Sequence, residues 1–202
     1  ADEIIIATSN LERDTPIEVH CTKSNIPFYR GDEEDVLDRH YQCAKIFSLT
    51  HIVRIPSDKP LIDPETVDSI IKFFIENNFD YVANFEITQK NNSLIFNSTY
   101  PSGTEVEIFS FNSLETAWKN AKTKDEREHV TPYLYLNSQK FKTKYLKQSK
   151  NLSHYRWSLD YESDMRLIRK IIKKIPTRPI LTIDIIKLLE NNPELYQINK
   201  IH

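Results

Sequence analysis

The sequence predicts an α/β fold with a doubly wound, mostly parallel sheet that is interrupted by an inserted α+β segment. Three observations support this class. Apolar and β-branched runs alternate with helical patterns up to residue 84, in the order βαβαβαβ. Polar residues follow the ends of these runs, which is where ligands bind in open parallel sheets. The alternation then breaks between residues 85 and 137, so we place the insertion there.

The first part of the chain predicts a regular series of elements. Continuous β-branched residues indicate buried strands, and apolar residues spaced three or four apart indicate helices. Pro16 favours a helix start, because its missing N–H has no partner in a first turn. We expect strands at 3–8, 26–30, 51–55 and 81–84, and helices at 15–24, 32–47 and 64–77.

The second part is less regular. We expect a loop or hairpin at 89–97, strands at 105–110, 141–146 and 155–159, and helices at 113–121, 127–137, 163–174 and 184–190. Asn112 or Ser113 is the expected cap of the first of these helices, and Thr182 or Asp184 starts the last. In the helix at 163–174 the expected inward residues are Met165, Ile168, Ile171 and Ile172. We predict one domain over 1–175, followed at 176–202 by a linker, a helix and a tail that packs without recognisable chemistry.

Composition excludes several classes of protein. A net charge of -2 offers no general argument for nucleic-acid binding. No apolar run approaches the length of a membrane span. Cys21 and Cys43 lie in expected helices without metal-ligand spacing, which favours buried, free thiols in a reduced, cytoplasmic protein.

Two aspartates are the candidate metal ligands. Asp58 follows the strand at 51–55, and Asp160 follows the strand expected at 155–159, each just before a helix. Because both follow strands, they can meet over one edge of the sheet, and carboxylates with substrate phosphates are what Mg²⁺ prefers. The competing interpretation is that each aspartate is a helix cap or a turn residue.

Several sequence runs resemble one family and occur in its order along nearly the whole chain. They are IIIATSN, RGDEEDVLDRHYQCAK, VRIPSDKPLIDPE, YPSGTEVEIFS, EREHVTPY, LSHYRWSLDYESDMRLI and NPELYQIN. The family is the cytidylyltransferases that make CMP-activated acidic sugars, of the acylneuraminate and CMP-KDO synthetase type. Within it, the chain looks most like the spore-coat polysaccharide biosynthesis cytidylyltransferases.

The resemblance implies a fold and a reaction. The fold is the Rossmann-like nucleotidyltransferase type, also called the nucleotide-diphospho-sugar transferase type. The reaction transfers CMP from CTP to an acidic sugar or a similar acceptor, with release of pyrophosphate and with Mg²⁺ as cofactor. The product would serve surface polysaccharide or glycan biosynthesis. The resemblance also implies a homodimer formed through the insertion.

The resemblance assigns roles to residues one by one. The metal-binding acids are Asp58 and Asp160. The residues beside the nucleotide are Thr8, Ser9, Asp35, Val36, Leu37 and Arg39. The residues facing the sugar or a phosphate are Glu105, Glu107, Arg127, Glu128, His129, Tyr133 and Arg156.

Several of these residues also have simpler interpretations. Arg39 could be a solvated helix residue, Glu105 and Glu107 a solvated strand edge, and His129 a core or capping residue. Arg156 pairs either with Asp160 or with a phosphate. Arg54 lies in an apolar strand and needs a partner, because an unpaired buried charge is costly; a structural ion pair suits it as well as a substrate does.

Gly31 and Gly103 are the only glycines, so the chain has no Gly-rich phosphate loop. We therefore expect the family's first strand, and the loop that grips the triphosphate, to lie upstream of Ala1. Two other functions remain open at this point. One is a metal-dependent glycosyltransferase-like enzyme, and the other is a degenerate homologue that acts as a binding or scaffold protein.

Overall fold

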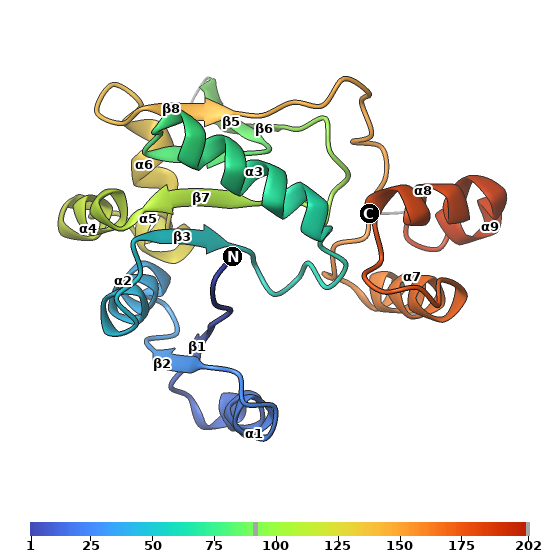
Figure 1. The fold of residues 1–202 in the computed structure, drawn as a ribbon, viewed down its shortest axis with the longest axis horizontal. Helices are drawn as coiled ribbons and strands as arrows, with labels where there is room; N and C mark the ends of the chain where they lie inside the picture. Colours follow the sequence, from blue (N-terminus) through green and yellow to red (C-terminus); the bar gives the residue numbers. More distant parts are fainter. Residues whose placement is uncertain (91–92, 201–202) are drawn as a thin grey trace. The chain divides into compact units, whose positions relative to one another are not determined.

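The computed structural model describes residues 1–90 and 93–200, and the chain divides into two compact units (Figure 1). The first unit holds Ala1–Val53, Asn78–Tyr81 and Ile108–Thr143, and the second holds Arg54–Asn77, Val82–Glu107 and Lys144–His202. Helices and partly parallel sheets occur together, which confirms the α/β class. The domain limits expected from the sequence stay a prediction.

Most helices and strands lie wholly within one of the two units. The first unit contains β1 (Ile6–Ser9), a 3-10 turn η1 (Glu12–Asp14), α1 (Thr15–Lys23), β2 (Phe28–Gly31), α2 (Val36–Ile46), α4 (Phe111–Asn120), α5 (Lys124–His129) and α6 (Pro132–Leu136). The second contains α3 (Pro64–Asn77), β5 (Glu86–Lys90), β6 (Ser93–Asn97), α7 (Glu162–Lys174), α8 (Thr182–Asn191) and α9 (Pro193–Tyr196). Each unit also holds part of β3 (His51–Arg54), β4 (Tyr81–Ala83), β7 (Glu107–Ser110) and β8 (Thr143–Tyr145).

These four strands form one sheet in the order β3-β7-β4-β8, in which β7 is the antiparallel strand. The residue after β7, Phe111, donates its N–H to Thr50, which precedes β3, and Ser110 donates to Asp80, which precedes β4. The end of β7 thus lies beside the starts of β3 and β4, so β7 is antiparallel to both (Figure 1). β4 and β8 begin side by side, because Tyr81 donates to Lys142.

β1 and β2 form a separate parallel pair, with Ile6 opposite Phe28 and Ser9 opposite Gly31. Helix α1 connects them, as a parallel crossover requires. The strand expected at 3–8 begins later, at Ile6, and ends on Ser9. The pairing therefore places Thr8 and Ser9 at the carboxyl end of the strand.

Helix α2 is the centre of packing in the first unit and contacts β2, α4 and α5. Asp35 caps its start by accepting the N–H of Asp38. Leu37 and Tyr41 are buried, and the Tyr41 ring stacks on Trp118 at 4.1 Å. The cysteines, Cys21 in α1 and Cys43 in α2, are buried and free, as predicted.

The expected helix at 127–137 is wrong, because the chain forms two helices there. α5 and α6 are separated at Val130, whose φ of 72° is outside helical geometry. The expected cap of α4 also shifts: Ser110 accepts the N–H of Ser113, so the side chain that caps the helix lies before Asn112.

The second unit contains the hairpin of β5 and β6, which are antiparallel. The hairpin alternative for 89–97 is therefore confirmed by the pairing of the two strands, and residues 91–92 lie outside the described residues. In the helix at 163–174, Ile168 and Ile171 are buried as expected, but Ile172 is exposed and Leu167 takes an inward place. Among residues 1–90 and 93–200, no helix has the length and apolar character needed to cross a membrane.

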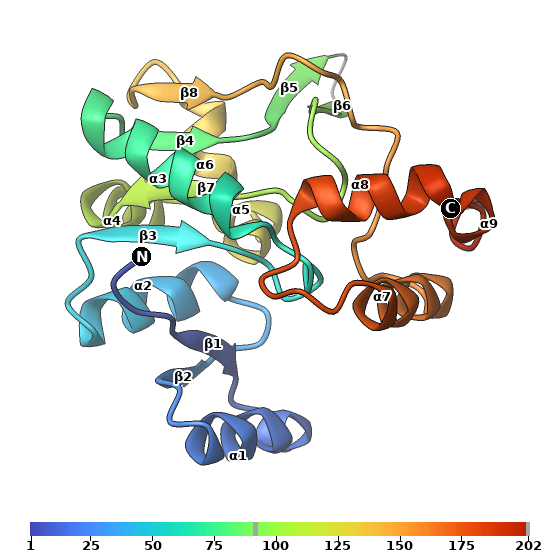
Figure 2. The ribbon, with the colours of Figure 1, turned by 45° about the vertical axis from the view of Figure 1, so that its right-hand side comes forward.

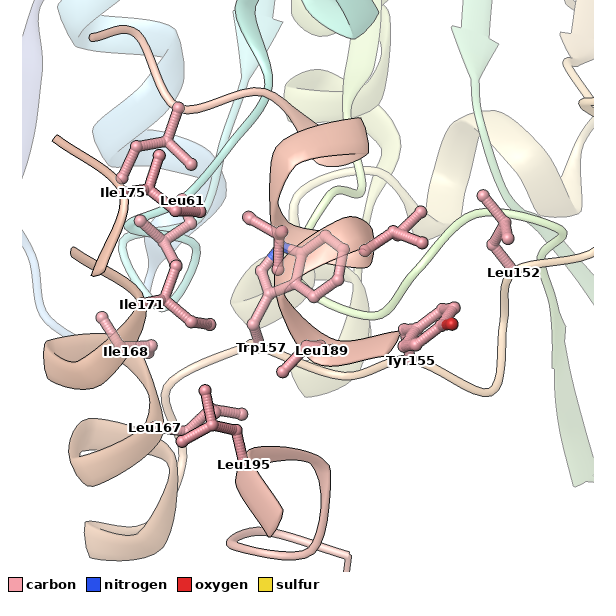
Figure 3. Close-up of a cluster of buried hydrophobic side chains, with 13 residues drawn as sticks. Leu61, Leu152, Tyr155, Trp157, Leu167, Ile168, Ile171, Ile175, Leu189 and Leu195 are labelled. Carbon is pink, nitrogen blue, oxygen red and sulfur yellow. The ribbon is translucent and has the colours of Figure 1, made fainter. Parts of the chain in front are cut away.

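Helices α7, α8 and α9 form a hydrophobic cluster with the segment 152–157, and α7 and α8 lie side by side in both views (Figure 1, Figure 2). Trp157 is fully buried within this cluster (Figure 3). Ile180, Leu189 and Leu195 are buried there too. The described part of the tail therefore packs into the cluster from Ile180 to Leu195, as the sequence predicted.

The strand expected at 155–159 is wrong. The segment is extended, but its only ladder contact among the described residues is a single parallel bridge between Ser102 and Arg156. Gly103 explains the close approach of these segments. It has a φ of 102°, and a Cβ there would lie 2.6 Å from the Ser158 nitrogen. The chain leading to Asp160 is thus held by the loop at 102–104 rather than by a sheet.

Candidate active site

Asp58 lies in a turn beyond β3, beside a buried lysine. Lys59 Nζ is 3.3 Å from Asp58 Oδ2 and 2.8 Å from Glu105 Oε2, and the Lys59 side chain is only 10% exposed. Burial alone would lower the pKa of Lys59, but the two carboxylates outweigh burial and raise this pKa. Lys59 is therefore charged at neutral pH, while the Asp58 side chain stays 35% exposed and reachable by ions.

Asp160 is held next to the Asp58 turn by the backbone. The N–H of Leu159 donates to the carbonyl oxygen of Asp58 at 2.8 Å. The two candidate metal ligands, 102 positions apart in the sequence, therefore belong to adjoining segments of the second unit. The Asp160 side chain is 46% exposed, so it too is reachable from solvent.

Arg156 forms the ion pair expected with Asp160. Its Nη2 contacts the Asp160 carboxylate and lies 3.1 Å from Asp164 Oδ2. Ser158 adds a hydroxyl donor to Asp160 at 3.3 Å. The alternative in which Arg156 binds a phosphate stays a prediction, since the structure pairs this guanidinium with carboxylates.

A cavity of about 550 Å³ lies in the second unit beside these groups. Glu105 lines it and is bound to Lys59, the partner of Asp58. Ser102 also lines it, and its hydroxyl is 3.5 Å from Arg156 Nη1. Most of the remaining lining is rich in hydroxyl and amide groups, supplied by Asn97, Ser98, Thr99, Tyr100, Asn151 and Ser153.

Glu107 does not line this cavity, although the sequence predicted that Glu105 and Glu107 lie on one strand at 105–110. Its side chain is 3% exposed and binds Arg54 Nη1 at 2.6 Å. The structural ion pair considered for Arg54 is therefore confirmed. The solvated-edge interpretation is wrong for both glutamates, because both are buried.

The carboxyl end of β1 in the first unit carries Thr8 and Ser9, which are buried, and a loop follows it. Arg30 holds this loop by donating from Nε to the carbonyl oxygen of Ser9 and from Nη2 to that of Leu11. The Ser9 hydroxyl donates to Asp14. The loop is thus fixed by contacts within the first unit, and its role beside a nucleotide stays a prediction.

Asp35 and Arg127 bind each other within the same unit. Arg127 Nε is 2.9 and 3.0 Å from the Asp35 oxygens, Nη2 is 2.5 Å from Oδ2, and Nη1 donates to the Trp118 carbonyl. Such a bidentate pair fixes both groups in one geometry. The guanidinium expected to hold a substrate carboxylate is therefore already engaged in linking α5 to α2.

The remaining site residues predicted in the first unit are buried, half-buried or exposed. Leu37 is fully buried, whereas Val36 is half-buried at the start of α2. Arg39 is half-buried and donates from Nη1 to the carbonyl of Asp32. Glu128 and His129 are exposed on α5, which rules out the core interpretation of His129, and Tyr133 is buried on α6.

The comparison with known proteins identifies the family. A family model described as cytidylyltransferase matches residues 1–197. The chain belongs to the cytidylyltransferase family. The order of the seven sequence runs and the α/β architecture are what membership of this family predicts.

Two curated relatives cover most of this cytidylyltransferase. An uncharacterized protein of Methanocaldococcus jannaschii, MJ1063, is 38% identical over 200 residues, which is 98% of this chain and 77% of that protein. The spore coat polysaccharide biosynthesis protein SpsF of Bacillus subtilis is 29% identical over 197 residues, or 96% of this chain and 77% of that protein.

Solved structures agree on the fold. A cytidylyltransferase from Leptospira borgpetersenii superposes with a TM-score of 0.87 at 26% identity, covering 98% of this chain and 80% of that one. A CMP:2-keto-3-deoxy-manno-octonic acid synthetase complexed with CTP has a TM-score of 0.57 at 12% identity, covering 86% and 82%. The predicted nucleotidyltransferase-type fold is therefore confirmed.

The donor set of this cytidylyltransferase suits a metal that arrives with its substrate. Among the described residues, no group of three or more His, Cys, Asp and Glu side chains could hold a metal ion. Mg²⁺ is commonly held by one or two carboxylates together with substrate phosphates and waters. Asp58 and Asp160, two half-exposed carboxylates on adjoining segments, fit that mode of binding.

Sequence reasoning missed Lys59, Ser102 and Ser158 as parts of this site. Lys59 directly follows Asp58 and lies between prolines, which could have drawn attention to it. Ser102 and Ser158 carry no signal in the sequence, because their role comes from the contact between the two segments.

Proposed function

We propose that this cytidylyltransferase transfers CMP from CTP to an acidic sugar and releases pyrophosphate, for the synthesis of a surface polysaccharide or glycan. Family membership supports the nucleotidyl transfer. The likeness to a spore coat polysaccharide biosynthesis protein supports the biosynthetic setting. The cytidine nucleotide is supported by the family and by a fold neighbour whose structure was solved with CTP.

The observation that carries the proposal is the hydrogen bond between Leu159 and Asp58. It ties the two segments that bear the candidate metal ligands, and it does so beside a cavity large enough for a sugar. Asp58 and Asp160 would hold Mg²⁺, which when bound neutralises phosphate charge. The acceptor hydroxyl loses its proton to water as its oxygen bonds to the α-phosphorus. The bond from this phosphorus to the oxygen that bridges the α- and β-phosphates breaks, and that oxygen leaves with pyrophosphate.

The side chains around the cavity can orient the acceptor. Its hydroxyl and amide lining offers both donors and acceptors to a polyhydroxylated molecule. Lys147 also lines the cavity. Its ammonium pairs with Glu86 at 3.3 Å and would need to exchange that partner to bind a substrate carboxylate. Holding the acceptor in this way raises the rate by fixing the direction of attack.

We also propose that the protein is a homodimer, in which the inserted segment at 85–137 of each copy completes the sugar site of the other. The proposal comes from the resemblance to the family. Light scattering coupled to gel filtration at micromolar concentration tests it, and a monomer across that range would refute it.

The central experiment measures CTP binding by calorimetry with and without Mg²⁺, and then pyrophosphate release with a panel of acidic sugars. We expect Asp58→Asn and Asp160→Asn to reduce turnover by about 100-fold or more, the usual effect of removing a group that stabilises transition-state charge. Asp68→Asn is the matched control, since Asp68 is an exposed aspartate on α3 in the same unit. Failure of the parent protein to bind CTP under any condition would refute the proposed function.

A further inference from the structure

Asp164 is a fully buried carboxylate behind the candidate metal ligand Asp160. It lies in the first turn of α7 with 0% exposure. Its Oδ2 accepts the backbone N–H groups of Asp160 at 3.0 Å and Tyr161 at 2.9 Å, and Arg156 Nη2 at 3.1 Å. Three donors on one oxygen are more than helix capping alone supplies.

The other carboxylate oxygen of Asp164 accepts a hydrogen bond from a residue of the C-terminal tail. Asn199 Nδ2 donates to Asp164 Oδ1 at 2.8 Å and to the carbonyl of Arg156 at 3.2 Å. Asn199 is only 5% exposed, which is unusual for a polar side chain. Helix capping explains the contacts to residues 160 and 161, but it does not explain a buried amide from the tail.

The tail is anchored on the segment that leads to Asp160. Tyr196 donates its hydroxyl to the His154 carbonyl at 2.9 Å and packs edge-on against the Tyr155 ring. Leu195 is buried in the hydrophobic cluster with Trp157. Residues 195–199 thus brace residues 154–157 by three kinds of contact, all within the second unit.

Arg156 connects this brace to the metal ligand. One nitrogen, Nη2, contacts both Asp160 and Asp164, so the guanidinium sits between the two carboxylates. The backbone of Asp160 is fixed from the other side by its N–H bond to Asp164. The direction of the Asp160 side chain therefore depends on where Asp164 is held, and Asn199 helps to hold it.

We propose that Asp164 and Asn199 are positioning residues that orient Asp160 for metal binding. The inference rests on the proposed function, in which Asp160 holds Mg²⁺. Partners in the outer shell of a metal site commonly change metal affinity or activity by about 10–100-fold when they are removed. The tail, which carries no recognisable chemistry in the sequence, then acts on the site through two hydrogen bonds.

The test is a double-mutant cycle between Asn199→Ala and Asp160→Asn, read out as Mn²⁺ affinity in the presence of CTP. We expect Asn199→Ala to weaken Mn²⁺ binding and turnover by about 10-fold or more in the parent, with little change in the acceptor KM. In the Asp160→Asn background the same substitution should leave the residual Mn²⁺ affinity unchanged. Asn191→Ala, an exposed asparagine at the end of α8, is the matched control.

A structural role alone gives a different pattern. Any loss of thermal stability from Asn199→Ala should be the same in both backgrounds, whereas the loss of metal affinity should appear in only one. Equal losses of Mn²⁺ affinity in both backgrounds, or none in the parent, would overturn the positioning role and leave the proposed function standing. A parent protein that binds neither CTP nor Mn²⁺ would overturn both.

Discussion

Replacing Gly103 by Ala should destabilise the protein strongly, because this glycine is constrained in two ways. Its φ of 102° is a conformation that residues with a side chain rarely adopt. A Cβ would also lie 2.6 Å from the Ser158 nitrogen and 2.8 Å from the Trp157 carbonyl carbon. Both neighbours are backbone atoms, so no side chain can rotate out of the way.

The size of the effect follows from these distances. To reach an ordinary contact of 3.4 Å, the loop and the segment at 157–158 must separate by about 0.8 Å. Backbone strain of this kind costs about 1–3 kcal/mol, and overpacking costs a similar amount. The smaller conformational freedom of Ala in the unfolded chain offsets about 0.4–1 kcal/mol. We therefore expect the free energy of unfolding to fall by about 2–4 kcal/mol.

Urea denaturation followed by fluorescence measures this change, with Gly31→Ala as the matched control. A Cβ at Gly31 meets side-chain atoms, the nearest being Arg39 Cγ and Tyr29 Cε1, each at 2.9 Å, and the position needs no positive φ. The control should therefore lose less stability, about 1 kcal/mol. If Gly103→Ala were as stable as the control, the reasoning about the backbone contact would be wrong.

Two further predictions concern buried groups. Arg54→Met removes the buried partner of Glu107 and should lower the unfolding free energy by about 3 kcal/mol, while the double variant with Glu107→Gln should regain part of it; a single variant as stable as the parent in urea would contradict this. Burial raises the pKa of the Cys43 thiol to about 11, so at pH 8 only about one thiol in 1000 is ionised. In a Cys21→Ser variant, a thiol reagent at pH 8 should therefore label Cys43 only when the protein unfolds, and rapid labelling of the native protein would contradict this.

Elements with a strong local pattern were predicted well. The apolar spacing at 64–77 and the Pro16 start placed α3 and α1 almost at their observed bounds. These features depend on neighbours three or four residues away, which the sequence shows directly. The break at Val130 was missed because a single residue with positive φ, favoured by the fold around it, overrides a helical pattern.

The segment before Asp160 shows where prediction from a local sequence pattern fails. A strand was expected at 155–159, yet the segment makes one bridge to Ser102 and is held by the Leu159 hydrogen bond to Asp58. Whether an extended segment becomes a strand depends on the partner beside it, and here the partner is 54 positions away in the sequence. The segments that carry the two acids adjoin through this hydrogen bond, and their joint role as metal ligands stays a prediction, whereas the strand expected before Asp160 is not formed.

For the charged residues of the site, the sequence showed the chemical type of each side chain but not which group it binds. Arg54 was recognised as a charged group that needs a partner, whereas Arg127 was expected to hold a substrate carboxylate and Glu107 to face the sugar. Only the fold showed that Arg127 binds Asp35 and that Glu107 binds Arg54, while Glu105 turns to the cavity beside Lys59. Which charged groups form ion pairs depends on which side chains lie close together in the folded protein, and the sequence does not show this directly.

By itself, then, the sequence determined the α/β class and the family, because these rest on local patterns and on runs of residues that can be read in order. It also singled out two aspartates as candidate metal ligands. The tertiary structure decided how the aspartates are held. Asp58 is flanked by a buried lysine, and Asp160 is held by Arg156, Asp164 and an asparagine from the tail. The physical reason is that folding brings distant segments together. Leu159 donates to Asp58 across 101 positions and Asn199 to Asp164 across 35, and these contacts fix the segments on which the nearby partners Lys59 and Arg156 act.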